Sequence, residues 1–439
     1  MAGFARQFPF VIVVVFAILF AAPALSAPSV VPSPRVTAAV VVRAQPTASS
    51  EALARMRPGE FLPLQQEISG WFQVLLPDGR TGYVSKAWAD IVPEAVTPAP
   101  PVWKIHFVDV GTGLATFVEG PDFALIYDGG SNDDYALGSR NRLLAYLHRV
   151  RPDLQVIDHI ILSHPHRDHV ELLPDLFDGY QVRNVWDSGR IYDICGYRSF
   201  LQKISTEPGV VYHDAASEAG VHAVSLPAKA CYGHTAPLSV HIADGTPITR
   251  GLKVPLGAGA SMTFLTADAG SYPDPNENSV VVRLDLGADR FLFMGDAEAS
   301  PDREPPSIPP RPNFAEGQLL TCCAADIQAD FMVVGHHGSM SSSRATFLNA
   351  VGAKIFVISS GPKDYGRAGH PVTLPDPEVV HEVESRGTLW RTDFDDPDCR
   401  TDAAKIGTDA DNNVGGCDNI LVRVPASGPP LVNYERIHD

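Results

Sequence analysis

Basic residues are scarce in this chain of 439 residues. It contains 34 Lys and Arg against 51 Asp and Glu, which gives a formal net charge of −17 at pH 7. Proteins that bind nucleic acid through its phosphates need clustered Lys and Arg side chains, and no basic stripe is visible. The composition therefore disfavours tight binding of long nucleic acid. It does not exclude a cleft whose positive charge comes from metal ions.

Long apolar runs are also lacking, with one exception near the N-terminus. The first 26 residues carry one charge, Arg6, followed by an apolar stretch from Phe8 to Ala22 and by Ala24-Leu-Ser26. This pattern predicts a secretory signal peptide over residues 1–26. The run is short for a membrane-spanning helix, and an uncleaved anchor is the alternative. We therefore expect a soluble mature protein that is secreted or periplasmic.

The six cysteines show no Cys-x-x-Cys spacing, so a thiolate metal site is not indicated. Six cysteines suit an oxidising compartment, where disulfides persist. Fifteen connectivities can be drawn among six cysteines, and the sequence does not decide between them. The candidate pairs are Cys399 with Cys417 across an Asp/Gly/Asn-rich loop, Cys195 with Cys231, and the adjacent Cys322 and Cys323. A disulfide between adjacent cysteines is sterically strained.

Residues 36–92 have the pattern of a small all-β unit, and the Pro-rich residues 93–102 form a linker after it. Val42-Arg43, Gly70-Trp-Phe-Gln-Val74 and Asp78-Gly-Arg-Thr-Gly-Tyr-Val84 resemble the bacterial SH3-type domain. The resemblance implies an SH3-like barrel, which often binds cell-wall or other extracellular ligands. Its aromatic side chains either line a ligand groove or build the small core; they are Trp71, Tyr83 and Trp88.

The most informative segment is Ser163-His-Pro-His-Arg-Asp-His-Val170, which follows the apolar run Val156–Leu162. The run predicts a buried strand, and Pro165 places the polar cluster on a strand-to-helix turn. Three imidazoles and a carboxylate on one turn can converge on metal ions. Such ligands suit zinc and its neighbours. The candidate ligands are His164, His166, Asp168 and His169.

This spacing, His-x-His-x-Asp-His, resembles the first metal-binding motif of the metallo-β-lactamase superfamily. Other segments resemble the family in the same order along the chain: Phe107–Ala115 with Ala124–Gly130, then Phe291–Glu298, then Met332–Ser339. The residues of these motifs most resemble those of the hydrolase domain of bacterial DNA-uptake proteins of the ComEC type and of its free-standing relatives. The resemblance implies an α/β fold, an αββα sandwich, over residues 103–439, with an insertion at about 188–259.

The resemblance also implies two divalent metal ions, with zinc favoured and manganese as the alternative. His164 and His166 hold the first ion in this reading, Asp168, His169 and His336 hold the second, and Asp296 bridges the two. Asp296 follows an apolar strand, where a carboxylate is costly unless it is paired or bound to metal. The first site is expected to be weak, because Asn276-Glu-Asn-Ser279 stands where many members have a further histidine. His234 is an alternative ligand to complete it.

The implied function is hydrolysis by a metal-bound hydroxide, with a phosphodiester as the favoured substrate, either a small molecule or a polymer. Asp168, His337 and His370 are the candidate catalytic residues. His337 is expected to face the substrate, and His370, in Gly369-His-Pro371, to protonate a leaving group or hold a phosphate oxygen. Hydrolysis of a β-lactam or lactone is the alternative activity. An inactive extracellular or cell-wall binding protein is a different alternative, against which the complete ligand set argues.

Overall fold

The computed structural model describes most of the chain. It divides the chain into two compact units, Met1–Thr97 and Pro98–Asp439. The predicted signal peptide, most of the linker and the pair Cys399 and Cys417 lie outside the described residues. No helix within the described ranges is long and apolar enough to cross a membrane. The described residues are 28–33, 35–36, 39–57, 60–76, 79–92, 101–132, 141–216, 221–361, 365–367, 370–393 and 419–435, with the backbone alone at 92, 101, 366, 367, 370 and 371.

The N-terminal unit is all β, as predicted. Its sheet has the strand order β3-β2-β6-β5-β4-β1-β7. The first strand precedes residue 36, where the sequence pattern placed the start of the unit. The strands are β1 (Ser29–Pro32), β2 (Val40–Arg43), β3 (Ala52–Met56), β4 (Leu62–Ile68), β5 (Trp71–Leu75), β6 (Thr81–Ser85) and β7 (Ala89–Val92).

Aliphatic side chains, with Phe72 and Met56, form the core of this small unit. Trp71 and Tyr83 are only partly buried, and Trp88 is 53% exposed. The reading in which these three aromatic residues build the core is therefore wrong. The alternation of buried and outward residues along β5 explains why, since Phe72 and Val74 take the inward positions and Trp71 the outward one.

The second unit contains two large sheets. The first has the order β13-β12-β11-β10-β9-β8-β25-β26, with parallel pairing from β10 to β13 and antiparallel pairing elsewhere. Its strands are β8 (Pro101–Phe107), β9 (Ala115–Glu119), β10 (Ala124–Gly129), β11 (Val156–Leu162), β12 (Gln181–Asp187), β13 (Val211–His213), β25 (Ile420–Pro425) and β26 (Leu431–Tyr434).

The second sheet has the order β16-β17-β18-β19-β20-β21-β24 and becomes parallel from β19 onward. Its strands are β16 (Lys253–Gly257), β17 (Ala260–Thr266), β18 (Val281–Leu286), β19 (Asp289–Phe293), β20 (Phe331–Val333), β21 (Ile355–Ile358) and β24 (Thr388–Arg391). A separate hairpin, β22 (Tyr365–Arg367) and β23 (His370–Val372), follows β21.

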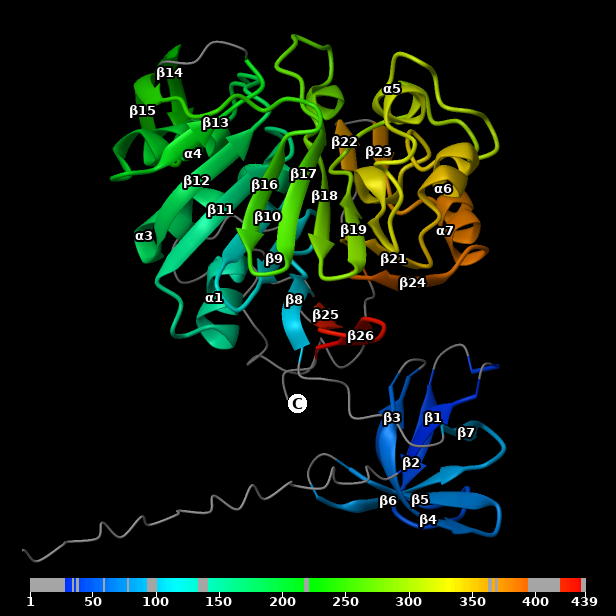
Figure 1. The fold of residues 1–439 in the computed structure, drawn as a ribbon. Coiled ribbons are helices and arrows are strands. Elements are labelled where there is room, and N and C mark those ends of the chain that lie inside the picture. Colours follow the sequence, from blue (N-terminus) through cyan, green and yellow to red (C-terminus); the bar gives the residue numbers. More distant parts are fainter. Residues whose placement is uncertain are drawn as a thin grey trace, which may run out of the picture. The chain divides into compact units, whose positions relative to one another are not determined.

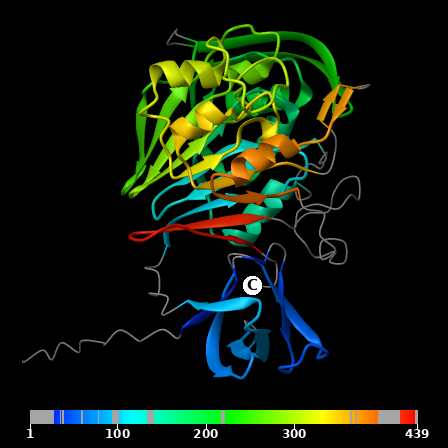
Figure 2. The ribbon, with the colours of Figure 1, turned by 90° about the vertical axis from the view of Figure 1, so that its right-hand side faces the viewer.

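Helices cover the outer faces of both sheets (Figures 1 and 2), with α5 to α7 in front of the second sheet in Figure 2. Three hydrophobic clusters fill the three spaces between the layers, one between the sheets and one under each helical layer. Alternation along the strands assigns side chains to these spaces: Ile160 packs under the helices and Ile161 between the sheets. The αββα sandwich is confirmed. The helices are α1 (Arg142–Val150), α2 (Arg167–Val170), α3 (Leu176–Gly179), α4 (Cys195–Thr206), α5 (Ala315–Cys322), α6 (Ala345–Val351) and α7 (Pro377–Glu384).

Residues 188–259, expected to be an insertion, do not form a separate body. They supply α4 and β13 to the first half of the sandwich and β16 to the edge of the second sheet. Only the hairpin of β14 (Val221–Cys231) and β15 (His234–Ala243) forms a sheet of its own. A disulfide between Cys195 and Cys231 ties this hairpin to the start of α4, and a second disulfide joins the neighbours Cys322 and Cys323.

Candidate metal centre

The centre begins where β11 ends. Every residue from His159 to Leu162 is buried, and Ser163 leads into the turn that starts α2. His166 is the N-terminal cap residue of α2, so Asp168 and His169 lie within its first turn. Gly130 lies directly behind this turn. A Cβ on Gly130 would come within 2.1 Å of the backbone nitrogen of His169. Only glycine allows this close approach, which explains the glycine after Asp128-Gly129.

Asp296 reaches the centre from the other sheet. It lies three residues after Phe293, where β19 ends. Gly295 has φ +55°, and a Cβ there would lie 2.7 Å from the Ser163 Cβ. The glycine therefore allows the two loops to touch, one from each sheet. Asp296 is 3% exposed, so its carboxylate is removed from water.

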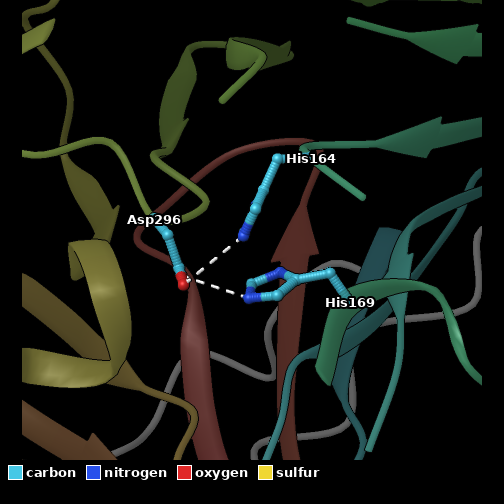
Figure 3. A group of neighbouring side chains, drawn as sticks. All are labelled: His164, His169 and Asp296. Carbon is cyan, nitrogen blue, oxygen red and sulfur yellow. Dashed lines mark ion pairs between the residues drawn. The ribbon is translucent and has the colours of Figure 1, made fainter. Parts of the chain in front are cut away.

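The two oxygens of Asp296 face different imidazoles. Oδ1 lies 3.2 Å from His169 Nε2 and 3.5 Å from His337 Nε2. Oδ2 lies 3.7 Å from His164 Nε2 and 3.8 Å from His336 Nε2. Figure 3 shows the His164 and His169 side chains pointing at this carboxylate from the neighbouring segments.

The order of His336 and His337 differs from the expectation. His337 Nε2 lies 3.2 Å from His169 Nε2 and 3.8 Å from an Asp168 oxygen, so His337, and not His336, joins the Asp168 and His169 group. Both residues adopt left-handed backbone angles, with φ of 48° and 52°, at a cost of about 1–2 kcal/mol each. This backbone sends the two neighbouring side chains to opposite oxygens of Asp296.

His166 is the outlying member of the group on the Oδ2 side. Its Nδ1 lies 3.0 Å from His164 Nε2, and its ring is 5.4 Å from the Tyr192 ring. Asn276 belongs to the segment that stands in place of the further histidine expected from the resemblance. Its side-chain nitrogen lies 3.2 Å from His336 Nε2. His234 is exposed at the start of β15. The structure thus brings His336, and not His234, toward the first ion position.

Hydrogen bonds behind the centre hold the imidazoles in one tautomer. His169 Nδ1 lies 2.8 Å from Asp128 Oδ2, and Asp128 also accepts from the Ser163 nitrogen and hydroxyl. His337 Nδ1 donates to the Ser359 carbonyl at 2.7 Å. In both residues Nε2 is left to face the centre. Such partners orient metal-binding histidines and raise their basicity. Asp128 has no predicted role in the sequence motifs, although it follows apolar strand residues as Asp296 does.

The electrostatics suit cation binding. Burial opposes the charge on Asp296, but His169, His337 and His336 hold the pKa of its carboxyl well below the ordinary value. Burial lowers the pKa of His164 and of His337, which favours their neutral, metal-binding forms. Burial also opposes the charge on His169 and His336, but Asp296 raises the pKa of both, that of His336 to about 9. Asp296 is buried, and its Oδ1 faces only the imidazole nitrogens of His169 and His337 among the contacts given above. A buried carboxylate is costly unless cationic groups face it, and a metal ion is one such group. The residues therefore fit divalent ions.

The other predicted elements lie around this cluster. Tyr365, at the start of β22, packs its ring 4.7 Å from that of His337. The backbone of His370 pairs with Arg367 in the β22–β23 hairpin, and the His370 side chain lies outside the described part of the chain. Ser341 Oγ lies 2.7 Å from His336 Nδ1, so this hydroxyl positions a histidine.

Several curated proteins are similar to this chain. Uncharacterized protein YcaI of Escherichia coli is 24% identical over 295 residues, which are 67% of this chain and 29% of that protein. Recombination protein 2 of Haemophilus influenzae is 26% identical over 60% of this chain and 24% of its own length. Competence protein ComA of Neisseria gonorrhoeae is 30% identical over 31% of this chain and 17% of its own. These relatives agree with the resemblance to DNA-uptake proteins, and the chain spans less than a third of their length.

Among solved structures, the metallo-beta-lactamase fold protein YhfI from Bacillus subtilis is 13% identical with a TM-score of 0.36, over 66% of this chain and 97% of that one. Tm1679, a metal-dependent hydrolase of the beta-lactamase superfamily, is 11% identical with a TM-score of 0.33, over 66% of this chain and 96% of that one. No argument about function follows from similarities of this size.

Two family descriptions match the chain in the places where the motifs lie. The bacterial SH3 domain matches residues 38–90, within the N-terminal unit. The metallo-beta-lactamase superfamily matches residues 108–361, which are more than half of the chain and include the histidine cluster, Asp296 and both histidines at 336 and 337. The αββα layers and the convergence of these side chains at one point agree with that match. Residues 38–90 of the chain form a bacterial SH3 domain. The chain belongs to the metallo-β-lactamase superfamily.

Proposed function

We propose that this protein is an exported phosphodiesterase that uses two divalent metal ions, zinc or manganese. The observation that carries the proposal is the Asp296 carboxylate, whose two oxygens face two separate groups of imidazoles. A carboxylate between two ligand groups suits a pair of ions. Two ions bound there would lower the pKa of a water molecule and neutralise charge on a phosphate.

Each ion position has its own set of side chains in this proposal. His164, His166 and His336 hold the ion on the Oδ2 side, and Asp168, His169 and His337 hold the one on the Oδ1 side. Asp296 serves both. Asp128 keeps the His169 Nε2 lone pair toward the centre, and the Ser359 carbonyl does the same for His337.

The substrate is proposed to be a phosphoester of a small molecule or an extracellular polymer. The names of two relatives concern recombination and competence, which makes nucleic acid a candidate. The net charge of −17 counts against a long nucleic acid strand, because such a strand needs cationic contacts along its phosphates. A cell-wall ligand for the SH3 domain is a further proposal, for which the exposed Trp88 offers an aromatic surface.

Export is proposed from residues 1–26 and from the cysteines. Both disulfides in the described part of the chain fit an oxidising compartment, since such bonds are rare in the cytosol. Secretion and retention in a periplasm are both consistent with this reasoning.

The direct test uses purified full-length protein stripped by a chelator and then supplied with zinc or manganese. We expect metal-dependent hydrolysis of bis(p-nitrophenyl) phosphate and little opening of a chromogenic cephalosporin. Asp296→Asn should abolish the phosphodiesterase activity and lower bound metal. Asp153→Asn removes a carboxylate that is 71% exposed and should change neither. Rapid β-lactam opening without any phosphodiester hydrolysis would contradict the proposal.

His370 is proposed as the group that protonates the leaving alkoxide when the P–O bond breaks. Tyr365, on the same hairpin, packs on His337, which brings that hairpin to the metal centre. A positioned acid contributes about 10²–10⁴-fold, so His370→Ala should lower kcat by that factor for alkyl leaving groups. The defect should shrink for acidic phenols, with metal content unchanged. Equal loss for all leaving groups would instead show that His370 holds the phosphate.

A further inference from the structure

A second group of metal-ligating side chains lies outside the centre described above. Asp214 follows β13, His222 lies in β14, and Asp244 follows β15. One possible ligand atom from each residue lies within 4.8 Å of the other two. None of these residues belongs to the catalytic cluster, and two of the three come from the hairpin that forms its own sheet.

The contacts within this group leave polar atoms unused. His222 Nδ1 lies 2.9 Å from Asp214 Oδ2. His222 Nε2 and Asp244 Oδ1 are both buried, and neither has a hydrogen-bond partner. A buried polar atom without a partner costs about 1–3 kcal/mol, and native proteins leave few of them.

Backbone interactions also hold the three residues near one another. Asp244 forms an isolated bridge with Tyr212, and the next residue, Gly245, donates its N–H to the Tyr212 carbonyl at 2.6 Å. Val221 and Ala243 are paired at the open end of the hairpin. Their chain neighbours His222 and Asp244 therefore both lie at this open end. The base of the hairpin is therefore fixed beside the edge strand β13.

The charge of the group is negative. Two carboxylates share one imidazole, and the buried Asp187 adds a third acid nearby, whose Oδ2 accepts hydrogen bonds from Tyr197 and Tyr212. Burial, followed by the charge of Asp214, raises the pKa of the Asp244 carboxyl. Burial opposes the charge on His222, but Asp214 raises the pKa of this imidazole above its ordinary value. A cation at this place would relieve the repulsion between the acids.

We propose that Asp214, His222 and Asp244 bind one additional divalent metal ion, which joins the base of the β14–β15 hairpin to the edge of the first sheet. One imidazole and two carboxylates suit zinc or manganese, with water in the remaining positions. Zinc–ligand bonds are about 2.0–2.2 Å, so the group contracts when the ion binds. The role is structural, because the ligands come from elements that frame the sandwich.

The alternative occupant of the same space is a proton. A protonated His222 between Asp214 and Asp244 would satisfy part of the charge with no metal at all. The two possibilities differ in one measurable quantity, the number of ions bound per chain.

The experiment counts bound ions in full-length protein by elemental analysis, after saturation with zinc or manganese and removal of the free metal. His222→Gln should lower the count by one ion per chain. The same decrease of one ion should appear in an Asp296→Asn background, because the two sites are independent. His241→Gln is the matched control, since His241 is exposed on the same hairpin and should leave the count unchanged.

Asp244→Asn provides a second variant that keeps the size of the side chain. It should weaken binding of the same ion at least tenfold in a calorimetric titration. Added zinc should raise the unfolding temperature of the Asp296→Asn protein, and this rise should vanish when His222→Gln is also present. Equal ion counts with and without His222 would overturn the proposal and identify the proton as the occupant.

Discussion

The two sides of the Asp296 carboxylate differ in how far their partners are enclosed. Hydrogen bonds orient rings on both sides, at Nδ1 of His169 and His337 and at Nδ1 of His336. On the Oδ1 side, His169 and His337 are also almost fully buried. On the Oδ2 side, only His164 is buried, while the side chains of His166 and His336 are 26% and 21% exposed. Enclosed, preoriented ligands hold an ion more tightly than exposed ones.

This difference suggests that the two positions hold their ions with different affinities. The Oδ1 side has the properties of a permanent site, because His169, His337 and the Asp296 oxygen that faces them are all buried. On the Oδ2 side, His166 contacts the Tyr192 ring and the Asp274 carboxylate, and the Asp274 side chain is 51% exposed. We therefore expect the first ion to exchange and the second to stay.

The largest effect should come from removing one histidine of the neighbouring pair. His337→Gln should lose the Oδ1-side ion and reduce hydrolysis to background, because Asp168 and His169 then lack the third member of their group. His336→Gln should keep that ion and lose only the weaker one. Elemental analysis after mild chelation, together with phosphodiester turnover, separates the two variants.

The reverse pattern would restore the order of ligands expected from sequence, in which His336 joins Asp168 and His169. Identical losses in both variants would show that the two sides of Asp296 act as one site. The pair is its own control, since both changes are His to Gln at adjacent positions with similar backbone angles.

A smaller effect is expected when the support behind the Oδ1 side is weakened. Asp128→Asn removes the charge that orients His169, and losses of such outer partners cost about 10–100-fold in metal affinity or activity. Asp158→Asn is the matched control. Asp158 also accepts a backbone N–H in the same sheet, from Ala124 at 3.0 Å, but at the other end of β11. A loss of equal size in both variants would mean that Asp128 acts only on stability.

The sequence was sufficient to locate the part of the site that is local in the chain. His164, His166, Asp168 and His169 lie on one turn after one buried strand, so spacing alone brings them together. The fold class followed from motifs in their order along the chain, and the alternating strand residues agree with it. Local periodicity carries this information well.

The parts that the sequence does not determine depend on contacts between distant segments or on unusual backbone angles. Nothing in Gly335-His-His-Gly338 indicates which histidine faces which oxygen, because the answer depends on two successive left-handed residues. Asp128 meets His169, which is 41 residues away. The range 188–259 was expected to be an insertion because it matches the family pattern poorly, and the pairing of its edge strand β16 with β17 depends on the fold.

The smallest predicted change is a gain of affinity on the open side. Asn276 is 3% exposed, its amide nitrogen lies 3.2 Å from His336 Nε2, and its Oδ1 has no hydrogen-bond partner. Asn276→Asp keeps the size of the side chain and adds a carboxylate beside the first ion position. We expect the Kd of the Oδ2-side ion to fall about tenfold, equivalent to about 1.4 kcal/mol, in a zinc titration. The Oδ1-side ion should bind as before and serves as the internal control. Weaker binding of the first ion in this variant would show that Asn276 does not border it, and the contrast between the two sides of Asp296 would then need another cause.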